Sequence, residues 1–368
     1  LAYAHLSLAD KVRIVWALIC AKSTDRHQPH LEDTTFHQWL KEHGQSDRAI
    51  HNFWTLVMLP ILNDRVETVS ATMGLMVIQE GMLQDYHSAD MGYATRDLNA
   101  ALGEPAKEYL QGQGCNIIFG CSVRKLILNS GRVTGIEIAS GETFTGQVFV
   151  SALPFSHLLA ILPPKTAEMP VFQNLKGLKT SPIVNVHIWY DRPVMEGDFC
   201  AFVDSPLQWV FNRTAFIQDA SSAAGNARHE VSEGTPSQGQ YICISHSAAW
   251  KYIEWNREDL IKEFVYEMRR VFPSARDAQV QRAIVVKQRN ATFRCLPGAN
   301  ELRPNSQTPI PNLFLAGAWT NTGWPSTMEG AARSGYNATK AIMESACITV
   351  NDKDSSSPVK PATDLTTG

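Results

Sequence analysis

The chain has 368 residues, of which 44% are hydrophobic and 19% charged, with 33 basic and 36 acidic side chains. This length and composition supply a sizeable buried core and exclude disorder, collagen and coiled coil for most of the chain. A formal net charge of -3 gives no large basic surface, so we expect no nucleic acid partner and favour an apolar one.

Cysteine usage and hydropathy indicate the compartment. The seven cysteines are scattered without a C-x-x-C pair, which is typical of a reducing environment. We interpret Cys115 and Cys121 as small buried apolar residues and not as a redox pair. No apolar stretch reaches the roughly 18 residues of a membrane span, and we expect no secretory signal. The protein is therefore expected in the cytoplasm, with peripheral contact at the cytoplasmic membrane left open.

The first third of the chain reads as helices. Ser7 and Asp10 have the spacing of a capping box. Apolar residues then recur at the helical period, namely Leu8, Val12, Val15, Trp16 and Ile19. A second helix is predicted after Thr35, and two more over residues 47–59 and 67–79.

The third predicted helix carries an apolar run, residues 53–62. We interpret Trp54 as a core residue, with a substrate tunnel wall or a surface that dips into a membrane as the alternatives. Five histidines lie between residues 27 and 51, without H-E-x-x-H spacing or a cysteine pair. They favour a solvated helical surface over a metal site.

The period changes from 3.6 to 2 after Gly103. A short helix is predicted over residues 104–112, with Pro105 in its first turn. A β-meander then follows, with strands at 116–119, 121–128, 133–139 and 142–150. Further strands are predicted at 183–190, 199–203, 208–211 and 241–245, with a polar loop over 217–240. Asn256 and Asp259 predict the start of another helix.

Residues 313–335 carry the most specific chemistry. A short apolar strand ends at Ala316-Gly317, a polar turn follows, and Pro325 is expected to open a helix to about Ser345. The helix start exposes backbone N–H groups that suit an anionic ligand. One stripe of this helix is mostly small and lets a sheet or an extended cofactor approach, namely Thr327, Ala331, Gly335, Ala338 and Ile342. The alternative is an ordinary helix packed on a strand by small residues.

This segment resembles the C-terminal FAD motif of the flavin amine oxidase and phytoene desaturase superfamily. The resemblance rests on Ala-Gly, Trp-Thr, Gly-Trp-Pro-Ser-Thr, Met-Glu-Gly-Ala and Ser-Gly, in that order, within residues 316–335. Residues 39–46, 98–105 and 302–304 further resemble the branch of squalene-associated FAD-dependent desaturases, which includes hydroxysqualene dehydroxylase.

The resemblance implies an α/β fold of mixed α+β character: a Rossmann-like FAD domain with a β-meander, and a substrate domain with a mixed sheet and helices. The implied divisions are a helical part of the substrate domain (1–95), an FAD-domain helix and meander (96–154), the remaining substrate domain (155–296), the C-terminal FAD-binding strand and helix (297–346) and a disordered tail (347–368).

The resemblance also implies residues that line the flavin and its ribityl chain, largely through backbone atoms: Gly317, Ala318, Gly323, Trp324, Thr327 and Met328. Val123 matches the family position whose backbone faces the adenine, and its alternative is a plain hairpin core valine. The sequence identifies no side chain as a catalytic acid, base or nucleophile. This is compatible with flavin chemistry, because the flavin itself carries the hydride.

Two features depart from the family pattern. The G-x-G-x-x-G phosphate motif does not occur in the sequence, so we expect a β-α-β unit before Leu1; without it FAD lacks its main phosphate cradle. Ala318 stands where this branch has an acidic residue. A missing carboxylate removes one or two charge-assisted hydrogen bonds of about 1.5–3 kcal/mol each.

The implied activity is FAD-dependent oxidoreduction of a lipophilic isoprenoid, first of all the dehydroxylation of hydroxysqualene to squalene in hopanoid or sterol precursor synthesis. The alternatives are a carotenoid or phytoene-type desaturase and a flavin amine oxidase. From another class, the alternative is a non-catalytic remnant or isoprenoid-binding subunit that needs a partner chain to hold FAD. The direction of hydride transfer and the oligomeric state stay open.

Overall fold

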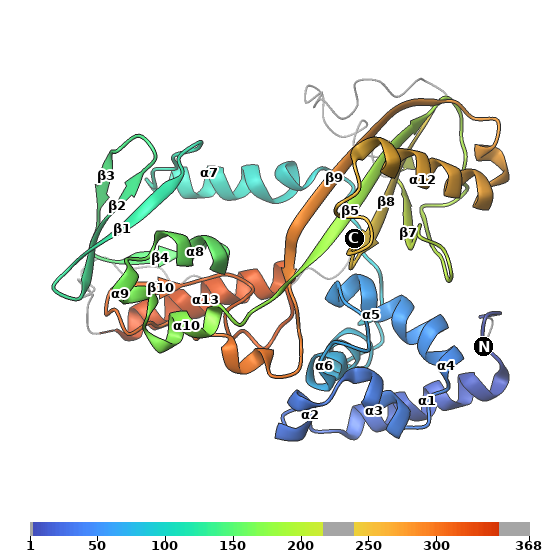
Figure 1. Cartoon of the computed structure of the whole chain (residues 1–368), viewed down its shortest axis with the longest axis horizontal. Helices are drawn as coiled ribbons and strands as arrows, with labels where there is room; N and C mark the ends of the chain where they lie inside the picture. Colours follow the sequence, from blue (N-terminus) through green and yellow to red (C-terminus); the bar gives the residue numbers. More distant parts are fainter. Residues whose placement is uncertain (1–2, 216–238, 346–368) are drawn as a thin grey trace.

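A computed structural model describes residues 3–215 and 239–345 (Figure 1). The predicted tail and most of the predicted 217–240 loop lie outside these residues. The chain begins with a helical region at the lower right of Figure 1. Its elements are α1 (Leu8–Ser23), α2 (Pro29–Asp33), α3 (Phe36–Glu42), α4 (Asp47–Ala49), a π-helical segment (Ile50–Trp54), α5 (Thr55–Leu62) and α6 (Ala71–Gly81).

Side-chain caps set the starts of these helices. The predicted capping box is confirmed, because Ser7 accepts from the Asp10 N–H and the Asp10 carboxylate accepts from the Ser7 N–H. Thr35 caps α3 as expected. The predicted helix at 67–79 instead begins at Ala71, because the Ser70 hydroxyl accepts from the Met73 N–H.

The apolar residues of α1 divide between two faces. Ile14, Ala17 and Ala21 are buried against the other helices. The apolar residues read from the sequence period lie on the opposite, exposed face: Leu8, Val12, Val15, Trp16 and Ile19, each more than half exposed. The sequence period therefore identified the helix, but its larger apolar residues do not form the core.

Trp54 is a core residue, as predicted, whereas Ile61 of the same 53–62 run is exposed. The Trp54 side chain is fully buried, lies edge-on to Phe36 and Phe53, and donates from Nε1 to the Gln45 amide oxygen at 2.9 Å. The predicted helix at 47–59 continues to Leu62, where Asn63 ends it in the left-handed conformation.

A helix and a three-stranded meander follow at the left of Figure 1. These elements are α7 (Glu104–Gly112), β1 (Val123–Asn129), β2 (Arg132–Ile138) and β3 (Thr143–Thr145). The predicted strand at 116–119 is wrong, because these residues are irregular. The predicted strand at 142–150 splits at Gly146, and its second half, β4 (Phe149–Ser151), pairs in parallel with β10 (Leu313–Leu315) and not with the meander.

Three short helices that the sequence did not predict follow β4: α8 (Phe155–Ile161), α9 (Pro164–Ala167) and α10 (Pro170–Leu175). Each begins at or just after a proline. A proline suits the first turn of a helix, because its missing N–H would have no partner there.

The largest sheet has five strands in the order β6-β7-β8-β5-β9. Their bounds are β5 (Thr180–Tyr190), β6 (Phe199–Ala201), β7 (Trp209–Asn212), β8 (Gln240–Ser247) and β9 (Val280–Phe293). Every pairing is antiparallel, so the sheet is not the mixed sheet expected. α12 (Arg257–Val271), capped by Asn256 as predicted, packs on one face of this sheet.

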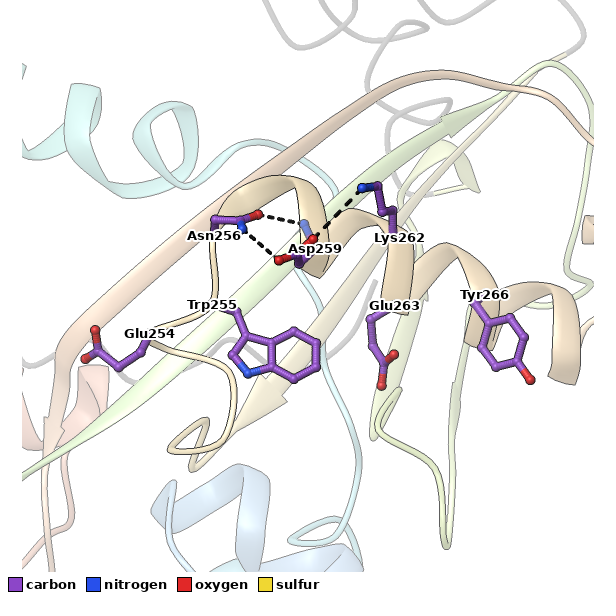
Figure 2. A pocket seen from close by; sticks show the side chains of 7 residues that line it. All are labelled: Glu254, Trp255, Asn256, Asp259, Lys262, Glu263 and Tyr266. Atoms are coloured by element: carbon purple, nitrogen blue, oxygen red, sulfur yellow. Dashed lines mark hydrogen bonds and ion pairs between the residues drawn. The ribbon is translucent and has the colours of Figure 1, made fainter.

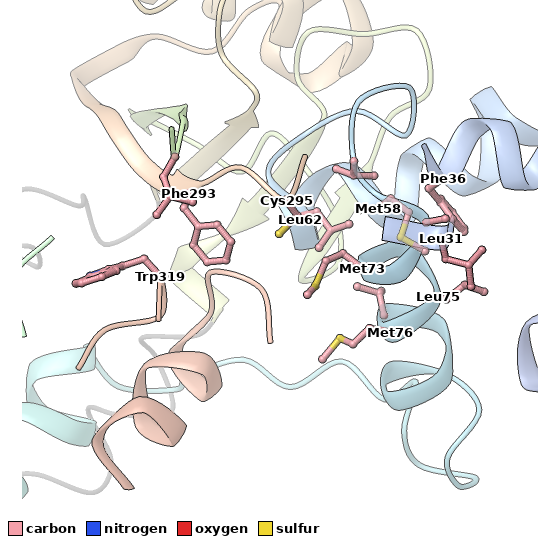
Figure 3. Packing of buried hydrophobic residues seen from close by; sticks show 14 of the residues in the cluster. Leu31, Phe36, Met58, Leu62, Met73, Leu75, Met76, Phe293, Cys295 and Trp319 are labelled. Atoms are coloured by element: carbon pink, nitrogen blue, oxygen red, sulfur yellow. The ribbon is translucent and has the colours of Figure 1, made fainter. Parts of the chain in front are cut away.

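A continuous apolar core joins the helical region to the carboxyl end of β10. Figure 3 shows Phe293 and Cys295 between Trp319 on one side and Leu62 and Met73 on the other, and all five belong to one buried cluster. The loop that follows β10 is therefore packed against the helical region through shared side chains.

Candidate flavin-binding site

The candidate site is a strand, loop and helix at the carboxyl end of a parallel strand pair. β10 ends at Leu315, the flavin loop spans residues 316–327, and α13 runs from Met328 to Glu344. Pro325 does not open this helix as predicted. Thr327 caps it instead, because its hydroxyl accepts from the Gly330 N–H at 3.1 Å. Ligands in α/β sheets lie at this edge of parallel strands.

A buried arginine organises the flavin loop. Arg303 is 4% exposed, and its guanidinium lies 4.6 Å from the centre of the Phe293 ring. It donates hydrogen bonds of 2.6–3.1 Å to the carbonyl oxygens of Ala318, Thr320 and Trp324 and to the hydroxyl of Thr322. Burial lowers the pKa of Arg303 from its ordinary value. One side chain thus fixes carbonyl groups along the whole loop.

Arg303 is itself positioned by the helical region. Its remaining contact is a 2.9 Å bond to the Asn300 amide oxygen, and Asn300 donates from its backbone and its side chain to the Glu32 carboxylate of α2. The sequence interpretation had noted residues 302–304 only as part of a resemblance. Nothing local in the sequence shows that Arg303 is buried against a loop 15–21 residues away.

Two glycines give the flavin loop a backbone that other residues disfavour. Gly317 has φ +134, and a Cβ there would lie 2.5 Å from Nε1 of Trp319. Gly323 has φ +72, yet a Cβ there would meet no atom within 4 Å. A left-handed glycine beside open space allows a flat ligand to approach the backbone closely. This geometry fits the flavin end of FAD.

The α13 helix packs on β10 through small residues, but Ala338 is the one residue of the predicted stripe that is buried. Its buried positions are Gly330, Ser334 and Ala338, whereas Ala331 is exposed and Gly335 is half-buried. A Cβ on Gly330 would lie 2.6 Å from the Pro325 carbonyl oxygen. Gly330 thus lets the flavin loop lie close to the first turn of α13, and the buried stripe lies one residue before the predicted positions 331 and 335.

An orphaned hydroxyl lies beside the loop. Ser151 ends β4 opposite Leu315, and its carbonyl accepts from the Ala316 N–H. Its Oγ is buried and has no hydrogen-bond partner among the described residues. Such groups are uncommon, and one at the ligand edge of parallel strands fits a missing polar ligand.

The predicted cofactor residues fall into two groups. Gly317, Ala318, Gly323, Trp324, Thr327 and Met328 lie together in the flavin loop and the first position of α13. Met328 is 67% exposed, and Ala318 offers only backbone atoms where an acidic residue was expected. Val123 lies apart from them, at the start of β1, where it pairs with Ile138 and packs on the main core.

Exposure and contacts bear on two other sequence interpretations. Cys115 and Cys121 are exposed, so their assignment as buried residues is wrong; both follow α7 in irregular chain. The N-terminal histidines have separate contacts. His43 stacks on Trp39, whereas His51 lies 2.6 Å from the Asp204 carboxylate.

The five-stranded sheet carries aromatic side chains on the face opposite α12, and two of them, Trp189 and Tyr241, are buried. The register places its aromatic side chains on this one face: His187, Trp189, Phe199, Trp209, Phe211 and Tyr241. Trp189 stacks on Tyr241 with ring centres 4.3 Å apart, and His187 Nδ1 lies 2.8 Å from the Tyr241 hydroxyl. We call these six residues the aromatic face. Sequence reasoning missed it, because it depends on pairing between distant strands.

The sheet reaches the flavin loop at one end. Thr180 of β5 pairs with Phe293 of β9, and the ring of Phe293 lies against the Arg303 guanidinium. From Thr180 to Trp189 an extended strand covers about 30 Å at 3.3 Å per residue. The aromatic face therefore lies on a sheet that extends from the loop over the length of a large hydrocarbon.

A separate pocket of about 720 Å³ lies on the outer side of α12 (Figure 2). It is lined by Glu254, Trp255, Asn256, Asp259, Lys262, Glu263 and Tyr266. Within it Asn256 and Asp259 bond one another at the helix cap. This charged surface contains no residue of the flavin loop or the aromatic face, so we assign it no role in the site.

The class of protein follows from these features: a parallel strand pair, a glycine-containing loop and a helix start have the arrangement of one end of a dinucleotide cofactor site, beside a five-stranded antiparallel sheet. Residues 1–343 match the model of the flavin containing amine oxidoreductase family. The chain belongs to this family, which confirms the predicted flavin cofactor and oxidoreductase class.

Individual relatives support the same assignment. The chain is 26% identical over 351 residues to the 15-cis-phytoene desaturase of Synechococcus elongatus, covering 92% of this chain and 71% of the relative. It is 26% identical over 347 residues to the chloroplast enzyme of Narcissus pseudonarcissus, covering 92% of this chain and 58% of the relative. The chain thus spans only part of these proteins.

Solved structures confirm the fold. An oxidoreductase from Methanosarcina mazei superposes with a TM-score of 0.69 at 15% identity, covering 91% of this chain and 73% of the other. Cyclohexylamine oxidase from Brevibacterium oxydans gives 0.62 at 14% identity, covering 93% and 76%. At this identity the likeness concerns the fold alone, and the predicted α/β class with sheets and helices is confirmed.

Proposed function

We propose that the protein transfers hydride between a bound flavin and a carbon atom of a long apolar isoprenoid. The observation that carries this proposal is the aromatic face, which lies on a sheet that begins at the flavin loop. Its aromatic surface suits a hydrocarbon, because aromatic rings bury large apolar areas. The names of the curated relatives, which are phytoene desaturases, support a substrate of this class.

The chemistry of the aromatic face favours a hydrocarbon over a polar amine. The register adds Ile183, Asn185, Cys243, Ser245 and Ile284 to this face, together with Arg282, whose guanidinium lies 5.0 Å from the Trp189 ring. The paired strands place no carboxylate on it. A cationic amine would therefore meet an arginine and no acidic partner.

Each part of the chain has a defined task in this reaction. A bound flavin supplies the hydride acceptor or donor. The flavin loop, fixed by Arg303, positions it through backbone atoms, and the helix start of α13 favours negative charge on the ligand. The rings of the aromatic face hold the chain of the substrate, exclude water and stabilise positive charge that develops on carbon.

Two reactions of this kind are candidates. Dehydroxylation of hydroxysqualene to squalene is supported by the resemblance of residues 39–46, 98–105 and 302–304 to that branch. Desaturation of a carotenoid precursor is supported by the curated relatives. They differ in direction: in the first, the hydroxyl leaves as water with a proton from solvent and hydride goes from flavin to carbon; in the second, hydride goes from carbon to flavin and the neighbouring carbon loses a proton.

The test uses the complete natural polypeptide with its flavin. We expect turnover of hydroxysqualene with reduced flavin, or of phytoene with oxidised flavin and an electron acceptor, measured as product by chromatography. Trp209→Leu is expected to raise KM about tenfold at unchanged flavin content, because it removes a half-buried ring from the aromatic face. Trp250→Leu, an exposed tryptophan outside that face, is the matched control. Turnover of a polar amine with neither isoprenoid converted contradicts the proposal.

A further inference from the structure

The exposed side of α1 is an apolar stripe with basic flanks. At 3.6 residues per turn, Leu8, Val12, Val15, Trp16 and Ile19 fall within about 100° of the helix circumference, on the side opposite to buried Ile14, Ala17 and Ala21. Their exposed fractions are 71, 63, 56, 57 and 57%. We call these five residues the α1 stripe. Large apolar patches of this kind mark interaction sites.

The charges of α1 are arranged around the stripe. Lys11 and Lys22 lie along one border and Arg13 beyond the other, and Arg13 lies 3.7 Å from Asp10. Asp10 is the one acidic residue in the α1 sequence; it is 1% exposed, and its carboxylate also accepts from Arg48, Ser7 and Ser46. The exposed surface of α1 is thus apolar in the centre and cationic at both borders.

A groove adjoins the α1 stripe. This pocket of about 530 Å³ is lined largely by apolar side chains, among them Leu6, Val12, Ile14, Val15, Phe53 and Leu56. Its volume is in the range of a site that encloses a small molecule. Apart from Lys11 at its rim, its lining carries no charged group.

Leu56 connects this groove with the aromatic face. It also lines a second pocket of about 210 Å³, together with Trp209 and with His51 and Asp204, which pair with each other. Trp209 belongs to the aromatic face. Leu56 therefore lies between the groove beside α1 and a pocket that reaches the aromatic face.

We infer that the α1 stripe docks on an anionic lipid surface, and that the adjoining groove takes up a hydrocarbon chain from it. The basic borders complement anionic headgroups, and Trp16 lies at the edge of the stripe, where an indole reaches the polar interface. A second copy of this chain fits less well, because antiparallel pairing of two α1 stripes opposes basic borders to basic borders. The uptake of substrate through the groove rests on the proposed function, whereas the docking does not.

The test is sedimentation of the purified natural protein with vesicles, which needs no turnover. We expect the wild type to bind vesicles of phosphatidylcholine with 30% phosphatidylglycerol, and pure phosphatidylcholine at least tenfold more weakly. Trp16→Ser/Ile19→Ser is expected to lower the partition coefficient about tenfold or more. Arg13→Gln/Lys22→Gln is expected to lower it about 30-fold on anionic vesicles and little on neutral ones. Both variants change exposed positions.

Tyr266→Ser, which removes a 63% exposed aromatic residue from α12, is the matched control and is expected to bind like the wild type. Circular dichroism and thermal unfolding verify that each variant is folded. Equal binding of wild type and α1 variants, or no binding of the wild type to anionic vesicles, overturns the inference. So does a wild-type dimer that Trp16→Ser/Ile19→Ser converts to a monomer with vesicle binding unchanged. If docking holds but no isoprenoid is converted, the proposed function alone fails.

Discussion

The flavin loop depends on one buried cation, whereas the five-stranded sheet depends on packing spread over many residues. The one side chain of Arg303 bonds the carbonyl groups of Ala318, Thr320 and Trp324. In the sheet, α12 buries a continuous apolar layer that includes Val184, Val186, Ile188, Ile242 and Ile244. A site made of backbone atoms is therefore most sensitive to replacement of the side chain that holds that backbone in place.

Replacing the buried guanidinium of Arg303 is expected to have the largest effect on stability and flavin binding. Arg303→Met removes the guanidinium bonds to three loop carbonyl groups and to the Thr322 hydroxyl, so we expect the free energy of unfolding to fall by about 4 kcal/mol and the bound flavin to be lost. Arg303→Lys is expected to recover part of both. Urea denaturation and flavin absorbance measure these effects.

The matched control is Arg289→Met, which removes an exposed arginine paired with Glu254. It is expected to cost less than about 1 kcal/mol, as exposed ion pairs do. Equal losses in the Arg303 and Arg289 variants contradict the organising role of Arg303.

The sheet carries a buried histidine, whereas residues 316–327 of the flavin loop include no titratable side chain. His246 of β8 is buried beside Phe264 and Tyr252; its Nδ1 bonds the Pro206 carbonyl oxygen, and Gln208 contacts its Nε2. Burial lowers the pKa of His246 to about 4, from 6.5. The unfolded chain therefore takes up the proton first, and stability is expected to fall by about 3 kcal/mol as pH drops from 6.5 to 4.

His246→Gln keeps a donor and an acceptor but does not titrate. Denaturation curves across this pH window are expected to be flatter for the variant than for the wild type. An unchanged slope in the variant would assign the pH dependence to other groups.

Two buried serines, one beside the flavin loop and one in the sheet, are expected to differ by a smaller effect on flavin binding. Ser151 beside the flavin loop and Ser181 in β5 both carry a buried Oγ without a partner among the described residues. Replacing either by alanine is expected to leave stability unchanged or slightly higher, because an unpaired polar group is removed. Ser151→Ala is also expected to weaken flavin binding about fivefold, and Ser181→Ala is not. Calorimetric titration with FAD separates the two, and equal affinities would remove Ser151 from the site.

Local signals in the sequence predicted much of the fold. The caps at Ser7, Thr35 and Asn256 involve side chains within three residues of the helix start, so a short pattern reveals them. The long strand β9 was missed because its charged and half-buried residues interrupt any apolar run. Of the helices, α1 was identified by period, but burial depends on which of its two apolar faces meets the other helices.

The candidate site likewise contains residues that a local sequence pattern identifies and residues that only the structure identifies. The loop glycines and the helix start form one contiguous stretch, and resemblance to a family motif found them. Arg303 and Ser151 come from other parts of the chain, and the aromatic face depends on strand register. Arg303, Ser151 and the aromatic face could be identified only from the three-dimensional structure, because their function comes from contacts between residues far apart in sequence.

The central claim is that the flavin loop holds the flavin, and Gly323 tests it most directly. Gly323 and Gly44 have φ of +72 and +73, and a Cβ on either meets no atom within 4 Å. Gly323→Leu and Gly44→Leu therefore introduce the same backbone strain, about 1–2 kcal/mol. We measure flavin bound per polypeptide in the purified natural protein and both variants. If the flavin loop holds the flavin, the wild type and Gly44→Leu are yellow and Gly323→Leu is colourless. Equal flavin content in the two variants would contradict this claim.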